Sequence, residues 1–322
     1  MFQGVLRMLF SAAMAAAVPA AALAAEYPDR PIRWLVPFSA GGGSDLATRI
    51  VARHVGETLG QPVVVENRPG AATIVAAQEA ARAQPDGYTV LTAGMSTLAL
   101  NPWLYGDLPY DPQNLTPVST LVALPIVLVA APNSGLRTLE HVKTYLKREP
   151  PGNYASLGVG SPHHLAMELF METIGGSATA VTYKGTPPAL QDVVAGIVPL
   201  MMADLAAARP LIQAGRLRAI AVPAARRSVQ LPDVPTFAEA GGPRFEAAAW
   251  QGVVAPAGTP APIAATLSQA IRQALASPEV MKQLVAQGME PAGSTPEAFR
   301  AYARQEHERW GAVIRGKGLS AE

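Results

Sequence analysis

The sequence predicts an α/β protein of two lobes, each built on a doubly wound sheet, with two crossover segments between them. Strand-like and helix-like segments alternate along most of the chain, which is typical of sheets covered by helices. The chain has 322 residues, 49% of them hydrophobic, which is enough to bury more than one core. Two extended apolar runs, 121–130 and 247–256, indicate where the chain leaves one lobe and returns. Pro125 inside the first run argues against a central strand.

The first residues are predicted to be a signal peptide, residues 1–24, and not part of the fold. Arg7 is followed by an alanine-rich apolar run, and Ala22-Leu23-Ala24 provides a small-x-small cleavage site. The run is short and alanine-rich for a transmembrane helix. The chain has no cysteine, which excludes disulfides and thiolate metal sites. Its formal charge of +1 gives no indication of a nucleic-acid partner.

The first strand–turn–helix unit carries the most informative stretch. An apolar strand is predicted at 32–36, and an amphipathic helix at 46–59 with apolar residues at helical spacing. Between them lies a glycine-rich turn, 37–45, where the backbone can approach a ligand closely because no Cβ intervenes. The helix directs unpaired N–H groups and a partial positive charge at this turn. Such a turn attracts anions.

The residues of the turn favour a small carboxylate over a nucleotide. Gly41-Gly42-Gly43 is followed by Ser44 and Asp45, so neither the dinucleotide fingerprint nor a P-loop lysine is present. Asp45 would also repel a multiply charged phosphate while stabilising the helix. The alternative is a tight turn with a capped helix and no ligand.

Two more strands complete the first lobe, at 62–65 and 88–92, with a helix at 73–82 between them. The last of these strands opens into the loop Gly94-Met95-Ser96-Thr97. Ligands gather at the carboxyl ends of strands in such sheets, where these loops lie.

The same pattern recurs between the two crossing runs. Strands at 154–157 and 180–183 each lead through a glycine-bearing turn to a helix that starts with Ser161-Pro162 or Thr186-Pro187. Ser or Thr as N-cap, Pro at the first helical position and Gly after the end are the expected helix signals. Further strands are predicted at 199–204 and 217–222. A glycine turn directly after a strand suggests that both helix starts face an anion in a cleft.

Signals for catalysis are weak. His163 and His164 are adjacent, so they do not share a helix face, and no His-Glu-x-x-His is present. Gly94-Met95-Ser96 begins like a nucleophile elbow but lacks the closing glycine. We expect no enzyme activity, no metal and no cofactor; a secreted α/β hydrolase using Ser96 is an alternative.

Taken in order, these segments resemble the solute-binding receptors of tripartite tricarboxylate transporters, also called Bug proteins. The resemblance covers nearly the whole chain after residue 26. It is carried by Tyr27-Pro28-Asp29-Arg30-Pro31-Ile32, the 37–45 loop, Val65-Glu66-Asn67-Arg68-Pro69-Gly70-Ala71, Pro85-Asp86-Gly87-Tyr88-Thr89, Tyr183-Lys184-Gly185, Pro232-Asp233-Val234-Pro235-Thr236-Phe237-Ala238-Glu239-Ala240-Gly241 and Ala255-Pro256-Ala257-Gly258-Thr259-Pro260.

The resemblance implies a type II periplasmic binding protein that closes on a small organic acid, either a di- or tricarboxylate, an amino acid or an aromatic carboxylate. Lobe 1 would comprise 25–124 plus 251–322, and lobe 2 would comprise 125–250. The implied partners are that acid and the membrane subunits of the transporter, with the receptor a monomer. A ligand-loaded sensor for a membrane signalling partner is the alternative with the same cleft.

The resemblance also implies the binding residues. One ligand carboxylate would be held by the first-lobe loop and by two second-lobe turns, and the 94–97 loop and Asp204 would supply distal contacts. The implied residues are Phe38, Ser39, Ala40, Gly41, Gly42, Ser44, Asp45, Gly94, Ser96, Thr97, Ser156, Gly158, Gly160, Ser161, His164, Tyr183, Gly185, Thr186 and Asp204.

The chain departs from the family pattern at two places. Ala40 replaces the usual proline, and 72–75 is poorer in glycine than in the family, which weakens a ligand contact by the Gly70 loop. Asp204 would favour an amine or hydroxyl on the ligand, or it would only cap a helix. Lys184 is the nearest cation to these turns, or a solvated surface lysine.

Overall fold

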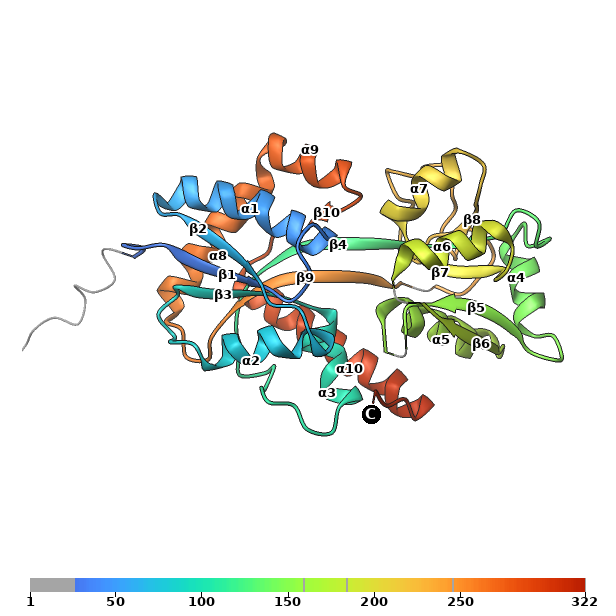
Figure 1. Cartoon of the computed structure of the whole chain (residues 1–322), viewed down its shortest axis with the longest axis horizontal. Helices are drawn as coiled ribbons and strands as arrows, with labels where there is room; N and C mark the ends of the chain where they lie inside the picture. Colours follow the sequence, from blue (N-terminus) through green and yellow to red (C-terminus); the bar gives the residue numbers. More distant parts are fainter. Residues whose placement is uncertain (1–26, 159, 184, 245, 322) are drawn as a thin grey trace, which may run out of the picture.

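Two lobes lie side by side and two long strands run between them (Figure 1). The computed structural model describes residues 27–158, 160–183, 185–244 and 246–321. The predicted signal peptide and Lys184 lie outside the described residues. Within the described part of the chain, no helix combines the length and hydrophobicity needed to cross a bilayer.

Lobe 1 contains a mixed sheet. Its strand order is β2-β1-β3-β9-β4, with β10 added on β4. The strands are β1 Ile32–Val36, β2 Val63–Asn67, β3 Thr89–Gly94, β4 Thr116–Ala130, β9 Ala248–Ala255 and β10 Glu290–Pro291. β1, β2 and β3 pair in parallel, whereas β9 is antiparallel to both β3 and β4. The doubly wound sheet predicted from the alternating segments is therefore parallel over β2, β1 and β3, and antiparallel where β9 joins it.

Helices cover both faces of this sheet because alternate residues of each strand point to opposite faces. Ile32 and Trp34 of β1 pack in one core and Leu35 in the other. The first face carries α1 Gly43–Leu59, α8 Ala261–Ala276 and α9 Pro278–Ala286. The second carries η2 Ala71–Thr73, α2 Ile74–Arg82, η3 Ser96–Leu100, α3 Asn101–Leu104 and α10 Pro296–Lys317.

Lobe 2 repeats this plan on a smaller sheet. Its order is β8-β4-β7-β5-β6, where β5 is parallel to β6 and β7. One face carries α4 Leu139–Leu146 and α5 Pro162–Ile174, and the other carries α6 Thr186–Ala195 and α7 Leu205–Gln213. The strands are β5 Gly152–Ser156, β6 Ala178–Thr182, β7 Leu200–Asp204 and β8 Arg218–Ala221. Gly175 and Gly196 end α5 and α6 with left-handed φ values of 64° and 78°, as their position after the helices predicts.

The crossing strands are β4 and β9, which run next to each other between the lobes (Figure 1). Pro125 argued against a central strand, and this prediction is wrong because β4 lies in the middle of the sheet. Pro125 is opposite Ala248 in the last pair with β9, and Ile126 begins the pairing with β7. The proline, which has no N–H to donate, thus lies where β4 changes partner.

Candidate functional site

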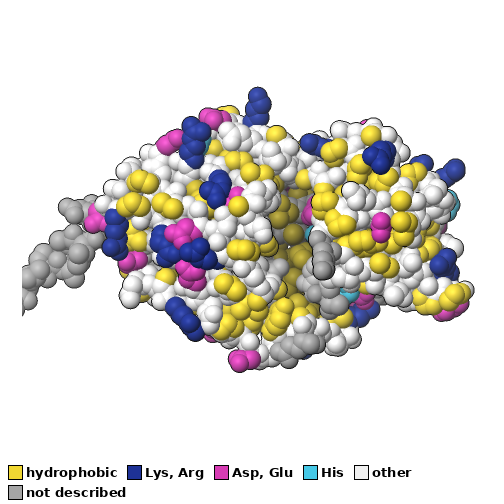
Figure 2. Space-filling view, viewed as in Figure 1, with side chains coloured by type: hydrophobic (Ala, Val, Ile, Leu, Met, Phe, Trp, Pro, Cys, Tyr) yellow, Lys and Arg dark blue, Asp and Glu magenta, His cyan; other side chains and the backbone are white. Residues whose placement is uncertain are grey.

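A cavity of about 410 Å³ lies between the two lobes. Figure 2 shows the hollow between them, with hydrophobic side chains inside it. Lobe 1 contributes the start of α1, the end of β3 and the start of η3 to its wall, and lobe 2 contributes the starts of α5 and α7. The crossing strands contribute Pro125, Trp250 and Gln251. The volume is in the range of small-molecule sites.

The first wall is the start of α1. The helix begins at Gly43, three residues earlier than predicted, and its N-cap Gly42 makes no side-chain capping bond. Gly43 and Ser44 line the cavity, and the Ser44 hydroxyl accepts a hydrogen bond from Gln251 Nε2. Gln251 is 4% exposed and its Oε1 has no partner among the described residues. This wall therefore offers uncapped backbone N–H groups and a hydroxyl to an anion.

Asp45 holds the loop before α1 and does not line the cavity. Its buried carboxylate accepts hydrogen bonds from Gly41 N at 2.8 Å, Arg49 Nε at 2.9 Å and Asn67 Nδ2 at 2.9 Å. Burial alone raises the pKa of Asp45, but these hydrogen bonds outweigh burial and hold the pKa below its ordinary value.

We expect Asp45→Asn to destabilise the protein by about 1–3 kcal/mol at pH 7, because charge-assisted hydrogen bonds are lost. Since the folded-state pKa of Asp45 is depressed, its contribution is present above the unfolded-state pKa and is lost as the pH falls through the folded-state pKa. The difference in unfolding free energy should narrow below about pH 4. Urea unfolding at pH 7 and in acid measures this difference between wild type and Asp45→Asn, and Glu57→Gln at an exposed position is the control. A difference independent of pH would contradict this role.

The second wall of lobe 1 has an unusual backbone. Ala71, Ala72 and Thr73 have φ of 42°, 49° and 81°, in the left-handed region that disfavours residues with a Cβ. Asn101 Nδ2 donates to Ala72 O at 2.8 Å, and Thr73 Oγ1 lies 2.9 Å from Thr97 Oγ1. Thr73 lines the cavity although the sequence departs from the family pattern here. These hydrogen bonds offset the cost of a strained turn at the site.

Gly94 lines the cavity, and this position requires a glycine for a steric reason. A Cβ at Gly94 would lie 2.3 Å from the carbonyl oxygen of Trp250. The glycine is therefore required where β3 and β9 meet at the cavity, and its predicted ligand contact would come from the backbone alone.

Lobe 2 places a carboxylate in the cavity. Asp204 Oδ1 lies 2.8 Å from His163 Nε2, and Asp204 Oδ2 accepts from Thr186 Oγ1 at 2.7 Å. Burial raises the pKa of Asp204, but His163 and the two hydrogen bonds outweigh burial and lower the pKa overall. Asp204 precedes α7 but makes no side-chain capping bond, so the capping role is wrong.

The charge of the site depends on the side chains that line the cavity. Among the described residues around the cavity, none is arginine or lysine. A bound carboxylate would therefore rely on hydroxyl and backbone N–H donors from lobe 1, and Asp204 would disfavour a second carboxylate near it.

The structure brings only some of the predicted residues to the wall formed by the described residues. Those on it are Phe38, Ser44, Gly94, Ser96, Thr97 and Asp204. Those not on it are Ser39, Ala40, Gly41, Gly42, Asp45, Ser156, Gly158, Gly160, Ser161, His164, Tyr183, Gly185 and Thr186.

Several of the second group have structural contacts instead. Ser161 caps α5 by accepting from His164 N at 3.2 Å, as predicted. The His164 ring lies against Tyr154 and Glu168, and burial lowers its pKa. The Tyr183 hydroxyl donates to Asp192 at 2.7 Å, and burial and this contact raise the pKa of Tyr183 to about 12. Thr186 was predicted as an N-cap, but Gly185 occupies that position, which leaves the Thr186 hydroxyl free to donate to Asp204.

Sequence reasoning missed His163, Gln251 and the segment at Gly288. The adjacent pair His163-His164 gave a signal, but only the ring of His163 reaches the cavity. Gln251 lies in a run that was predicted to cross between lobes, which could have placed it at the cleft. Gly288 meets Ala206 of lobe 2, a contact that no local pattern shows.

Two α/β lobes joined by crossing strands, with a ligand-sized cavity between them, form an architecture suited to binding a small solute. The sequence profile described as "Tripartite tricarboxylate transporter family receptor" matches residues 47–319, and the chain belongs to this family. It is 38% identical over 306 residues to Protein BugT of Bordetella pertussis, covering 94% of each chain.

Solved structures of similar sequence have the same fold. A Rhodopseudomonas palustris protein with adipate is 34% identical, with a TM-score of 0.80 over 91% of this chain and 99% of the other. MatC from the same organism, with bound malate, is 33% identical with a TM-score of 0.76 over 89% of this chain and 100% of the other.

Proposed function

We propose that this receptor binds a small organic acid between its lobes and presents it to the membrane subunits of a tripartite tricarboxylate transporter. The observation that carries the proposal is the cavity between the lobes, with uncapped helix starts on one side and Asp204 on the other. The acids bound by the two R. palustris relatives support the chemical class.

The ligand's carboxylate would lie against Ser44, Ser96 and the backbone of the α1 start. Its other end would face Asp204 and His163, so that a hydroxyl or an amine is favoured there. Micromolar affinity needs roughly −8 kcal/mol. An acid of about ten heavy atoms must then contribute roughly 0.8 kcal/mol per atom, which requires nearly complete burial between closed lobes.

Calorimetry against a panel of dicarboxylates, hydroxy acids, amino acids and aromatic acids tests this function. We expect at least one acid to bind with micromolar affinity. Failure of every acid in the panel to bind would count decisively against a carboxylate receptor.

Asp204→Asn tests the proposed ligand end. The change removes a charge and keeps an acceptor for Thr186, so we expect the preference to shift toward dicarboxylates by about tenfold or more, since like charges at close range cost on the order of 1–4 kcal/mol. Asp192→Asn, which alters a lobe 2 carboxylate bonded to Tyr183, is the matched control. An unchanged preference ratio would show that Asp204 does not face the ligand.

Two other roles make different predictions. A sensor would share the cleft and differ in partner, so a pull-down with the ligand-loaded form separates it from a transport receptor. A hydrolase would need Ser96 activated by His163, but no hydrogen bond joins these two residues in the described structure. We therefore propose binding rather than catalysis, and any hydrolysis left unchanged by Ser96→Ala would remove the support for Ser96 as a nucleophile.

The predicted location and organisation complete the proposal. We propose export to the periplasm through residues 1–24 and action as a monomer. The lobe boundaries, 25–124 plus 251–322 and 125–250, stay a prediction; limited proteolysis with and without ligand would locate them.

A further inference from the structure

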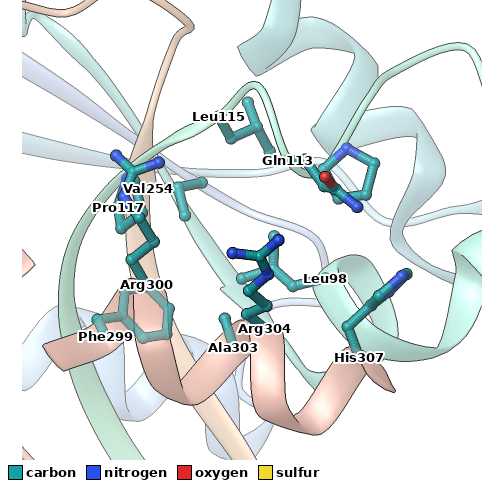
Figure 3. A pocket seen from close by; sticks show the side chains of 11 residues that line it. Leu98, Gln113, Leu115, Pro117, Val254, Phe299, Arg300, Ala303, Arg304 and His307 are labelled. Atoms are coloured by element: carbon teal, nitrogen blue, oxygen red, sulfur yellow. The ribbon is translucent and has the colours of Figure 1, made fainter. Parts of the chain in front are cut away.

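A second, smaller cavity lies within lobe 1, on the side of α10. It has a volume of about 200 Å³ and is lined by η3, β9, α10 and the segment before β4 (Figure 3). Its lining shares no residue with the cavity between the lobes.

The inner part of this cavity is apolar. Leu98, Leu115, Val254 and Phe299 line it, and each is less than 10% exposed, at 7%, 3%, 1% and 0%. Such a surface accepts a ring or a short alkyl chain, because burial of apolar area is favourable.

The outer part is cationic. Arg300 and Arg304 are four residues apart on one face of α10, and both line the cavity, with the Arg300 side chain toward Pro117 and Arg304 nearer its middle (Figure 3). Arg304 Nε lies 3.5 Å from Glu308 in a pair that is highly exposed. Arg300 forms no ion pair with any described residue. Two like charges one turn apart repel each other, and an anion between them would relieve the repulsion.

We propose that this cavity is a second binding site, for a small monocarboxylate with an apolar body, such as an aromatic or short-chain fatty acid. The apolar body would lie on Leu98 and Ala303, and the carboxylate would lie between Arg300 and Arg304. This chemistry differs from that of the cleft, whose described lining has hydroxyl and backbone N–H donors, His163 and the acidic Asp204 but no arginine or lysine.

The two sites share one element. Leu98 of η3 lines the second cavity, while Ser96 and Thr97 of the same short helix line the cleft. A ligand in either site would therefore lie next to the short helix η3, which also forms part of the wall of the other site.

The probe is 4-fluorobenzoate, whose binding is followed by fluorine NMR. Wild-type protein should bind it, and the double variant Arg300→Gln/Arg304→Gln should bind at least about tenfold more weakly because charge-assisted hydrogen bonds are lost. Ala303→Leu should give a similar loss by filling the cavity from α10. Arg53→Gln on α1, which removes an exposed arginine elsewhere, should bind like wild type.

Gly288→Ala separates this site from the cleft. It alters the contact between the lobes and should leave fluorobenzoate binding at the second cavity unchanged. If Ala303→Leu does not fold, the double variant Arg300→Gln/Arg304→Gln tests the second site by itself.

Three results would overturn the proposal. One is no fluorobenzoate binding by wild type, and another is equal binding by the arginine variant. The third is an acidic peptide without a ring that binds at these arginines as tightly as fluorobenzoate, which would assign the cavity to a partner protein.

Discussion

Gly288→Ala should weaken binding of the cleft ligand by about 10- to 100-fold, because overpacking costs roughly 1–3 kcal/mol. Gly288 lies in the turn between α9 and β10 of lobe 1 and faces α7 of lobe 2. A Cβ there would be 2.2 Å from Ala206 Cβ and 2.7 Å from Ala206 Cα. Backbone atoms cannot move aside cheaply, so the lobes would have to separate and leave the acid partly in water.

The control for this variant is Gly258→Ala. Gly258 also has a left-handed φ, of 81° against 79° for Gly288, but nothing lies within 4 Å of its added Cβ. Both variants therefore carry similar backbone strain, and only one affects the contact between lobes. Calorimetry gives the affinity, and small-angle scattering shows whether ligand still compacts the protein. Wild-type affinity in Gly288→Ala would mean that this contact is not part of the bound state.

Glu306→Ala should lower the free energy of unfolding by about 2–5 kcal/mol. Glu306 of α10 is 6% exposed and accepts hydrogen bonds from Trp250 Nε1 at 3.1 Å and Trp310 Nε1 at 2.9 Å. Its removal leaves two buried indole N–H groups without an acceptor, and it breaks the ion pair with Arg309. Trp250 lines the cleft, so ligand binding should also weaken.

Two further variants identify the cause. Glu306→Gln keeps an acceptor oxygen and should lose less than half as much stability, whereas exposed Glu308→Ala should lose almost none. Urea unfolding measures all three. Equal losses for Glu306→Ala and Glu308→Ala would contradict the role of the buried carboxylate.

Much of the fold could be predicted from local patterns. Apolar spacing predicts the strand β1 and the helix α1. Ser161 predicts the start of α5, and the glycines after the helices predict the ends of α5 and α6. The crossing strands were also recognisable. Their antiparallel pairing could not be predicted, because β9 lies far along the chain from β3 and β4. No pattern in residues 247–256 indicates which strands it pairs with.

The site could be predicted less completely, because it depends on which way side chains point. Two histidines in sequence differ by a large rotation around α5, and the ring of His163 meets Asp204 while that of His164 turns to Glu168. Thr186 reaches the site only through Asp204. Gln251 and Gly288 come to the cleft through tertiary packing, which sequence patterns do not encode locally.

A crystal structure with the acid that binds most tightly in the calorimetric panel is the most direct test of the site. We expect the acid between the lobes, with its carboxylate within hydrogen-bond distance of Ser44 or Ser96 and its other end at Asp204. An acid found outside this cavity, or one oriented with a carboxylate against Asp204, would contradict the proposed receptor site.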